Sequence, residues 1–123
     1  MNSQDTPPTI KNFAEPCPFE SLLRLLLGQW TPLIIWTLQT KGELRFTELK
    51  HEVQGISGRV LTERLRQLEQ HDIISRRYVA AIPPQVSYCL TDRGEELRDV
   101  LTPLNSLARR WVSEDIEKYS TQN

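Results

Sequence analysis

The feature that most constrains the fold is the spacing of leucines in residues 55–70, GISGRVLTERLRQLEQ. Leu61, Leu65 and Leu68 recur at steps of four and three, which places them on one face of an α-helix. At about 100° per residue, the opposite face of that helix is polar. It carries Arg59, Glu63, Arg66 and Gln70, with Thr62 beside them. The pattern predicts a helix that buries its leucines and presents arginines outward.

A second, shorter helix is predicted immediately before this one, over residues 47–53, with Thr47 as its N-cap. Gly55 suits the tight turn between the two helices, and Ser57 is a favourable N-cap for the second. Helix, short turn and helix in this order form a helix-turn-helix.

Two further helices are predicted upstream. The first begins at Pro18 with Cys17 as its N-cap, because proline suits the first helical position. Its apolar face consists of Leu22, Leu23, Leu26 and Leu27. The second covers residues 30–40, with Thr31 as its cap, and ends at Gly42. Residues 43–46 then form a short strand.

Two strand-like runs, 73–80 and 86–91, follow the helix-turn-helix and are joined by AIPPQ. In the second run, Val86, Tyr88 and Leu90 alternate with smaller residues, as in a half-buried strand. A β-hairpin after the second helix of a helix-turn-helix is a wing. We therefore predict a mainly α fold with a small β-hairpin wing: a winged helix-turn-helix, assembled as a dimer.

The C-terminal region is predicted to be one long helix that starts from a cap at Thr91 or Asp92. Pro103 lies inside it, which predicts a kink near Asp99 or Val100. Its apolar stripe is longer than a small winged domain needs, so we predict that it forms a dimer together with the first helix. The predicted interface consists of Leu22, Leu97, Leu101, Leu104, Leu107 and Trp111.

The length of 123 residues corresponds to one domain. We predict a flexible tail over residues 1–15 and a winged domain over 16–119. The net charge is −1, so a nucleic-acid partner must be argued from local charge. Residues 58–77 hold five arginines and three acidic residues, whereas residues 92–118 hold five basic and seven acidic residues. One end of the domain is therefore moderately basic and the other is acidic.

Other function classes find no support in the sequence. His51 and His71 are interpreted as surface residues, because they lack metal-ligand spacing to each other or to the cysteines. No phosphate-binding glycine loop, nucleophile elbow or paired carboxylate motif is present in the sequence. The apolar stretch 22–38 is interrupted by polar residues and proline, and no signal peptide is evident. We predict no enzyme activity, cofactor, metal or membrane association, and a cytoplasmic location.

The arginine-bearing helix is the candidate DNA-reading element, because arginine can bind guanine O6 and N7 in the major groove. The alternative is that its arginines merely face solvent. The wing can reach a minor groove or only close the sheet, since its tip carries Gln85 and no basic residue. The predicted DNA-binding residues are Thr47, Ser57, Gly58, Arg59, Thr62, Glu63, Arg66, Arg77 and Gln85.

The two cysteines receive different interpretations. Cys17 is placed at a helix N-terminus, where unpaired N–H groups favour the reactive thiolate. It is either a redox-sensing residue or an inert cap. Cys89 lies within a predicted strand and is interpreted as a small filler residue.

The assembled pattern resembles the HxlR family of bacterial winged-helix transcriptional regulators, which are relatives of the MarR type. The resemblance covers about residues 16–112 and rests on five segments: CPFE at 17–20, LLGQWTPLIIWTL at 26–38, LRFTELK at 44–50, GISGRVLTERLRQLE at 55–69 and PPQVSYCLTDRG at 83–94. The sequence departs from the family at Gln29 and Gln85, where the family often has a basic residue.

The resemblance implies a homodimer joined through its first and last helices, with a recognition helix at 58–70. It also implies that Cys17 matches a cysteine that some members use to sense oxidants or electrophiles. We predict a dimeric repressor that binds a palindromic operator on double-stranded DNA, with room for a small-molecule effector. The alternative is a winged-helix protein-interaction module that does not read DNA directly.

Overall fold

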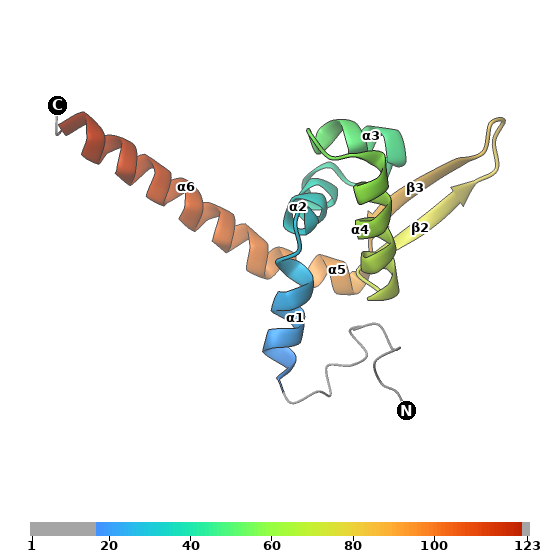
Figure 1. Ribbon diagram of the computed structural model, residues 1–123, viewed down its shortest axis with the longest axis horizontal. Coiled ribbons are helices and arrows are strands. Elements are labelled where there is room, and N and C mark those ends of the chain that lie inside the picture. The colour runs from blue at the N-terminus through green and yellow to red at the C-terminus, as the bar shows by residue number, and fades with distance from the viewer. Residues whose placement is uncertain (1–16, 122–123) are drawn as a thin grey trace.

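The computed structural model describes residues 17–121, which fold into helices around a small antiparallel sheet (Figure 1). The elements are α1 (Pro18–Leu26), α2 (Thr31–Lys41), β1 (Leu44–Arg45), α3 (Phe46–Glu52), α4 (Gly58–Gln70), β2 (Ile74–Val79), β3 (Gln85–Leu90), α5 (Asp92–Glu96) and α6 (Arg98–Thr121). The β2–β3 hairpin projects from one side of the helical body, and α6 extends away on the other side (Figure 1). The predicted 1–15 tail lies outside the described residues.

The N-terminal helices begin as their sequences dictate, with one exception. Cys17 caps α1 as predicted, because its Sγ accepts a hydrogen bond from the Glu20 N–H at 3.4 Å. Gly42 ends α2, also as predicted. Thr31 does not cap α2: the N-cap is Trp30, which has a φ of 75°. Thr31 is already in the first turn and is buried, so its hydroxyl does not serve the free N–H groups.

The helix-turn-helix consists of α3 and α4. Ser57 caps α4 as predicted, with its Oγ accepting from the Val60 N–H at 3.1 Å. The predicted Thr47 cap is wrong, because α3 starts one residue before it and takes Arg45 as its N-cap. The Glu48 carboxylate accepts a hydrogen bond from the Arg45 N–H at 2.8 Å, as the third helical residue does in a capping box.

The hydrophobic core lies between the helices and the inner face of the sheet. Leu61, Leu65 and Leu68 of α4 are 0%, 2% and 0% exposed, so the predicted leucine stripe is confirmed. Other members of the core are Leu26, Ile34, Ile35, Leu38, Leu49, Val53, Ile56, Ile73, Ile74, Leu97 and Leu101. This packing fixes the orientation of α4 and therefore which of its residues face outward.

The sheet has the strand order β1-β3-β2, so β3 is its central strand. The predicted 43–46 strand is shorter than expected, because Phe46 already belongs to α3. The predicted simple alternation in β3 is wrong at Ser87, which is the most buried residue of the strand at 5% exposure. A central strand has neighbours on both sides, and the Glu43 carboxylate accepts a hydrogen bond from the Ser87 hydroxyl.

The C-terminal region divides into two helices, α5 and α6, rather than forming one. Thr91 caps α5 as predicted. The break lies at Leu97, not at Asp99 or Val100, and three-residue hydrogen-bond steps on both sides of Leu97 mark it. Packing of α5 supplies the reason, because a Cβ on Gly94 would lie 2.1 Å from the Ile73 carbonyl oxygen. The break therefore lies where α5 leaves this close contact, and Pro103 lies farther along, inside α6.

His71 corrects another expectation from the sequence. It is 7% exposed rather than on the surface, and its Nδ1 lies 2.8 Å from the Gln67 carbonyl oxygen. This contact belongs to the last turn of α4, where the same Gln67 carbonyl also accepts the backbone N–H of His71 at 3.1 Å. The histidine therefore closes the C-terminus of α4. His51 is exposed, as predicted.

Two further features of the described residues bear on other functions. Within residues 17–121, no single helix is long and apolar enough to cross a membrane. In this range only α1 and α2 taken together have the length and apolar character, and they are bent by 79°. The same part of the chain contains no group of three or more His, Cys, Asp or Glu side chains arranged to hold a metal ion.

Candidate nucleic-acid interface

The outer face of α4 is polar and accessible. Arg59, Thr62, Glu63 and Arg66 are all exposed, while the leucines on the other side of the helix hold it to the core. Arg59 forms an exposed ion pair with Glu63 at 3.6 Å, and Thr62 bonds back to the Gly58 carbonyl at 2.8 Å. Exposed pairs of this kind are weak, so both side chains can exchange partners. The face offers long hydrogen-bond donors near the start of a helix.

The third arginine of α4 has a different place. Arg64 is half-buried, and its Nε donates to the Gln29 carbonyl oxygen at 2.8 Å. This bond links α4 to the turn before α2. Arg64 contributed to the local positive charge counted from the sequence, but its geometry makes it a structural residue.

The wing presents two different faces. In the β2–β3 register, Arg76 is paired with Tyr88 and Arg77 with Ser87, so the two arginines point to opposite sides of the sheet. Arg77 Nη1 lies 3.8 Å from Glu43 Oε1, and Ser87 donates to the other oxygen of the same carboxylate. The predicted DNA contact Arg77 therefore already has an ionic partner.

Tyr88 shows which side of the wing faces α4. It packs against the hydrophobic core, and burial raises the pKa of its phenol above 10.0. The nearby Glu69 carboxylate also raises this pKa, whereas the Arg76 and Arg66 guanidinium groups lower it. Arg66 of α4 and Arg76 of β2 thus lie near the same phenol.

Sequence reasoning missed Arg76. The signal was present in the alternation of β2, where Ile74, Arg76 and Tyr78 share a face and Ile74 is 1% exposed. Because Ile74 is a core residue, Arg76, two positions later in the same strand, lies on the face of the sheet that is turned toward the helices.

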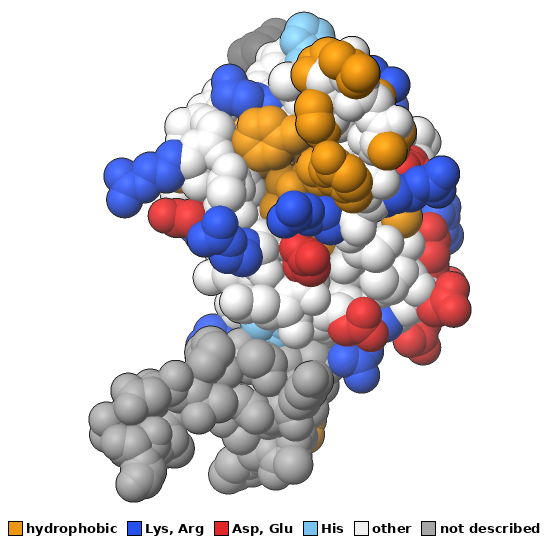
Figure 2. All heavy atoms as spheres, turned by 90° about the vertical axis from the view of Figure 1, so that its right-hand side faces the viewer, with side chains coloured by type: hydrophobic (Ala, Val, Ile, Leu, Met, Phe, Trp, Pro, Cys, Tyr) orange, Lys and Arg blue, Asp and Glu red, His pale blue; other side chains and the backbone are white. Residues whose placement is uncertain are grey.

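The tip of the wing is apolar. Ile82 is fully exposed and Tyr78 is 63% exposed, while Gln85 is half-buried beside Val79 at the start of β3. Figure 2 looks onto this side of the molecule and shows hydrophobic side chains gathered together with Lys and Arg side chains around them. The basic groups of the hairpin, Arg76 and Arg77, lie in the middle of β2, and the tip between the strands has none.

Comparisons with known proteins identify the family. Residues 25–116 match the model of the HxlR-like helix-turn-helix family. The chain belongs to this family. It is 35% identical over 102 residues to the uncharacterized HTH-type transcriptional regulator YvaP of Bacillus subtilis, covering 82% of this chain and 94% of that one. It is 39% identical over 99 residues to the regulator sll1512 of Synechocystis, covering 80% and 73% of the two chains.

Solved structures agree with this assignment and confirm the winged-helix fold. A putative MarR-family regulator from Porphyromonas gingivalis superposes with a TM-score of 0.72 at 29% identity, covering 77% of this chain and 92% of that chain. The reduced form of YodB from B. subtilis gives a TM-score of 0.67 at 36% identity, covering 74% and 88%. The redox regulator HypR in its oxidized form gives 0.70 at 30% identity, covering 76% and 96%.

In this HxlR-family chain, the predicted dimer residues separate into two groups. Leu97 and Leu101 are 8% and 9% exposed and belong to the core of the protomer, so little of their surface is available to a second copy of the chain. Leu22 is half-buried against the same core. Leu104 and Trp111 are 57% and 56% exposed, and Leu107 is half-buried.

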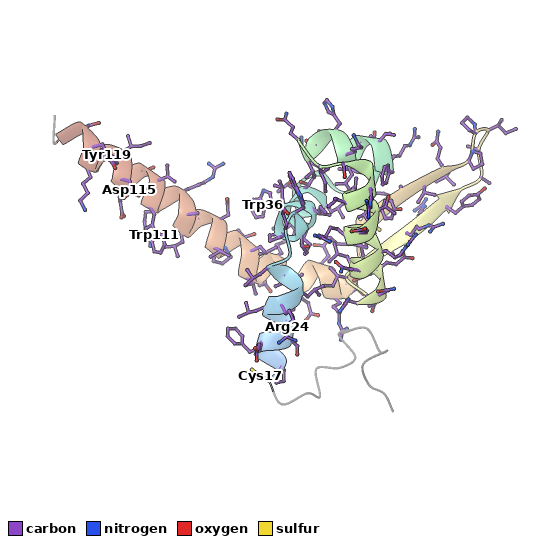
Figure 3. The ribbon with its side chains drawn as sticks, in the orientation of Figure 1. Cys17, Arg24, Trp36, Trp111, Asp115 and Tyr119 are labelled. Carbon is purple, nitrogen blue, oxygen red and sulfur yellow. The ribbon has the colours of Figure 1, made fainter. Side chains whose placement is uncertain are left out.

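The accessible apolar surface continues farther along α6 than the sequence analysis proposed. Val112, Ile116 and Tyr119 are each at least 58% exposed. Figure 3 shows Trp111, Asp115 and Tyr119, spaced by four residues, along one side of the part of α6 that extends from the body. In the sequence, charged residues lie between these positions, so the apolar periodicity of this part of α6 was not recognised.

The two cysteines of the HxlR-family chain are both free thiols. Cys17 is exposed at the start of α1, at the opposite end of that helix from α2 (Figure 3). Cys89 is half-buried, with its Sγ 3.2 Å from the Ser75 hydroxyl. An attacking reagent therefore reaches Cys17 more easily.

Proposed function

We propose that this chain is a sequence-specific DNA-binding transcriptional regulator that acts as a homodimer. The observation that carries the proposal is the placement of Arg59 and Arg66 on the accessible face of α4, the second helix of the helix-turn-helix. In this motif the second helix enters the major groove, where arginine reads guanine. Membership of the HxlR-like family supports the proposal.

The proposed contacts follow from the ends and faces of the elements. Thr47 near the start of α3, and Ser57 and Gly58 at the start of α4, offer polar groups to phosphates. Thr62, Glu63 and the two arginines face the bases, and Gln85 approaches the minor groove from the wing. We leave Arg77 out of this set, because the strand register places it on the face away from Tyr88, where the Glu43 carboxylate lies 3.8 Å from its guanidinium.

The exposed part of α6 supports the homodimer. This helix has 24 residues and is therefore about 36 Å long, and much of it extends beyond the body of the protomer (Figure 1). Its apolar side chains Leu104, Trp111 and Ile116 are accessible, which is costly unless a second surface covers them. A second copy of α6 supplies such a surface, and a two-fold dimer matches a palindromic operator.

We propose repression as the outcome of binding, because a dimer that covers a promoter excludes polymerase without needing any additional surface. The proposed location is the cytoplasm, where a bacterial chromosome is accessible. The proposed effectors are oxidants and electrophiles that react with Cys17. Exposure of this thiol at the cap of α1 supports the proposal, and so does similarity to HypR and to the diamide-treated form of YodB.

A mobility-shift assay with random and genomic DNA at two salt concentrations tests the proposal. Retention of a few genomic fragments at the higher salt supports sequence-specific reading, because non-specific binding weakens steeply with salt. No retention at either concentration would favour the alternative, a winged-helix protein-interaction module. The net charge of −1 and the uncharged wing tip are the observations that favour that alternative.

A further inference from the structure

Two consecutive arginines of the wing are in different chemical situations. Arg76 and Arg77 are neighbours in β2, and successive side chains of a strand point to opposite faces. Their cross-strand partners in β3 are Tyr88 and Ser87. Tyr88 packs on the core, so Arg76 shares the face that looks toward the helices, whereas Arg77 lies on the outer face.

Arg77 is engaged on that outer face. Its guanidinium is 3.8 Å from the Glu43 carboxylate, which also accepts a hydrogen bond from Ser87. Ser87 is 5% exposed and sits in the central strand, so one oxygen of Glu43 is held at a fixed place. A phosphate that approached Arg77 would lie beside this carboxylate and would be repelled by it.

Arg76 is exposed and has neither an ion pair nor a hydrogen bond to any side chain in residues 17–121. Arg66 on the accessible face of α4 has no such partner within this range either, and both arginines lie near the Tyr88 phenol. Glu69 is the acidic group in the same neighbourhood, and it does not approach either guanidinium within ion-pair distance. The side of the wing that faces α4 thus holds a net positive charge, with two guanidinium groups against one carboxylate near the Tyr88 phenol.

The expected path of bound DNA would bring phosphate groups close to this positive charge. A winged helix places its second helix in the major groove and its wing at the neighbouring minor groove. One sugar-phosphate strand must then pass between the two elements. Contacts between arginine or lysine and these phosphates supply most of the sequence-independent affinity for DNA.

We propose that Arg76 binds a backbone phosphate between α4 and the wing, and that Arg77 instead positions the wing through Glu43 and Ser87. This inference rests on the proposed DNA-binding function and assigns its electrostatic contact to a residue that the sequence motif does not indicate. Because the two arginines are adjacent and both exposed, each one is a matched control for the other.

The test measures binding of the full-length chain to random-sequence duplex DNA by fluorescence anisotropy between 50 and 200 mM salt. Each lost phosphate contact lowers the slope of log K against log salt by about 0.9, which corresponds to roughly a 3.5-fold change in relative affinity over this range. Arg76→Ala should show this loss for each protomer, and Arg76→Lys should restore the slope because it keeps the charge. Arg77→Ala should keep the wild-type slope.

A second variant separates the two roles further. Glu43→Gln removes the carboxylate beside Arg77 and Ser87 on the face away from α4, so it should leave the salt slope unchanged and lower the thermal stability of the chain. Glu96→Gln, on α5, makes the same charge change at an exposed site away from the wing and serves as its control.

The outcomes distinguish this inference from the function on which it rests. Equal slopes for Arg76→Ala and wild type, or a loss only in Arg77→Ala, would overturn the assignment while leaving DNA binding intact. No binding by the wild type at 50 mM salt would overturn the proposed function, and the phosphate site with it. Thermal unfolding of both alanine variants shows whether a lost slope reflects a misfolded wing.

Discussion

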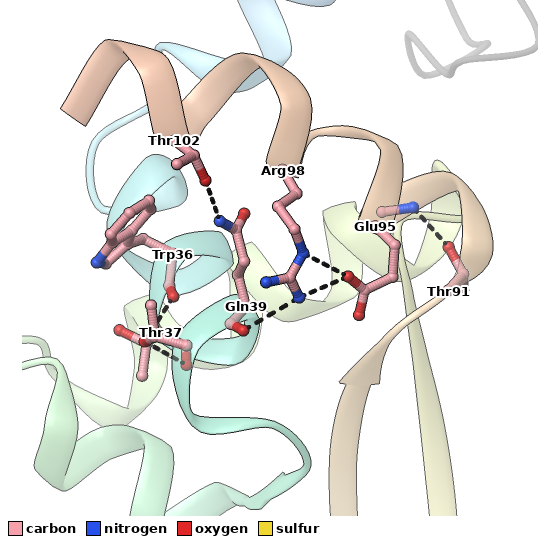
Figure 4. A network of polar contacts seen from close by, with 9 residues as sticks. Trp36, Thr37, Gln39, Thr91, Glu95, Arg98 and Thr102 are labelled. Carbon is pink, nitrogen blue, oxygen red and sulfur yellow. Dashed lines mark hydrogen bonds and ion pairs between the residues drawn. The ribbon is translucent and has the colours of Figure 1, made fainter. Parts of the chain in front are cut away.

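Gln39 of α2 donates a hydrogen bond from its Nε2 to the Thr102 hydroxyl of α6 across 2.9 Å (Figure 4). Arg98, one turn earlier in α6, donates to the Gln39 backbone carbonyl at 3.3 Å and is held by Glu95 at 2.8 Å. These bonds join the first turns of α6 to the helix-turn-helix body. They hold the direction in which the long helix leaves the protomer, and this direction would set the angle between the two α4 helices in the proposed dimer.

The same glutamine provides a prediction about stability. Gln39 is 7% exposed, and its Oε1 has no hydrogen-bond partner among the described residues. Removing an unsatisfied buried group recovers about 1–3 kcal/mol, whereas losing the bond to the exposed Thr102 costs about 0.5–1.5 kcal/mol. Gln39→Met keeps the shape of the side chain, so its free energy of unfolding should be unchanged or higher by roughly 1 kcal/mol.

Urea unfolding at fixed protein concentration measures this difference. Gln39→Glu should be strongly destabilising, because it buries a charge at the same place. Gln70→Met, on the exposed end of α4, is the control and should remain within about 0.5 kcal/mol of wild type. A Gln39→Met protein that unfolds at much lower urea would show that Oε1 has a partner in solution.

The face of α4 leads to a prediction about specificity. Arg59→Ala and Arg66→Ala should each cost roughly 1–3 kcal/mol in binding to the operator and should reduce discrimination against random DNA. Competition binding with labelled operator measures both quantities. Arg93→Ala, an exposed arginine on α5, removes the same charge and should leave discrimination unchanged. If neither α4 variant changes discrimination, α4 does not read bases.

The different burial of leucines along α6 leads to a prediction about assembly. Leu104→Glu and Trp111→Glu should yield folded monomers, because both side chains are more than half exposed in the protomer. Leu101→Glu should instead destabilise the protomer itself, since Leu101 belongs to the core. Sedimentation and thermal unfolding distinguish the two effects. Ile82→Glu, at the exposed wing tip, should stay dimeric, and a monomeric wild type at micromolar concentration would contradict the proposed interface.

Local patterns predicted the parts of the fold that local physics decides. The leucine period of α4 and the caps at Cys17, Ser57 and Thr91 appear in the structure as the sequence indicates. Each depends on residues within one or two helical turns. The winged topology also followed, because a hairpin after a helix-turn-helix has few alternatives.

The errors arose where distant residues decide the outcome. The break at Leu97 depends on the contact between Gly94 and the Ile73 carbonyl, more than twenty positions apart in the sequence. Burial of Leu97 and Leu101 depends on the same packing. The spacing of apolar residues along the helix therefore could not distinguish residues of the protomer core from residues available to a partner. The ion pair between Arg77 and Glu43 similarly requires the pairing of β1 with β3, which no short sequence motif predicts.

The last prediction concerns Cys17. Its thiol is exposed at the cap of α1, whereas Cys89 is half-buried, so alkylation of the folded protein should be faster at Cys17 than at Cys89. Diamide takes two electrons and two protons from a pair of thiols and leaves a disulfide. The structure gives Cys17 and Cys89 separate positions, at the start of α1 and within β3. The expected product is therefore a disulfide between the Cys17 residues of two protomers, or one with a small thiol.

Such a group at the first turn of α1 should change the angle between the protomers of the proposed dimer, because α1 and the start of α6 both contribute leucines to the same core. Paired reading helices tolerate little change in the spacing of half-sites, about 34 Å for one helical turn. Diamide should therefore weaken operator binding by wild type and by Cys89→Ser, but not by Cys17→Ser. Non-reducing electrophoresis and operator binding, measured on the same samples, check the two parts. If diamide weakens Cys17→Ser as much as wild type, Cys17 only caps its helix and the switch lies elsewhere.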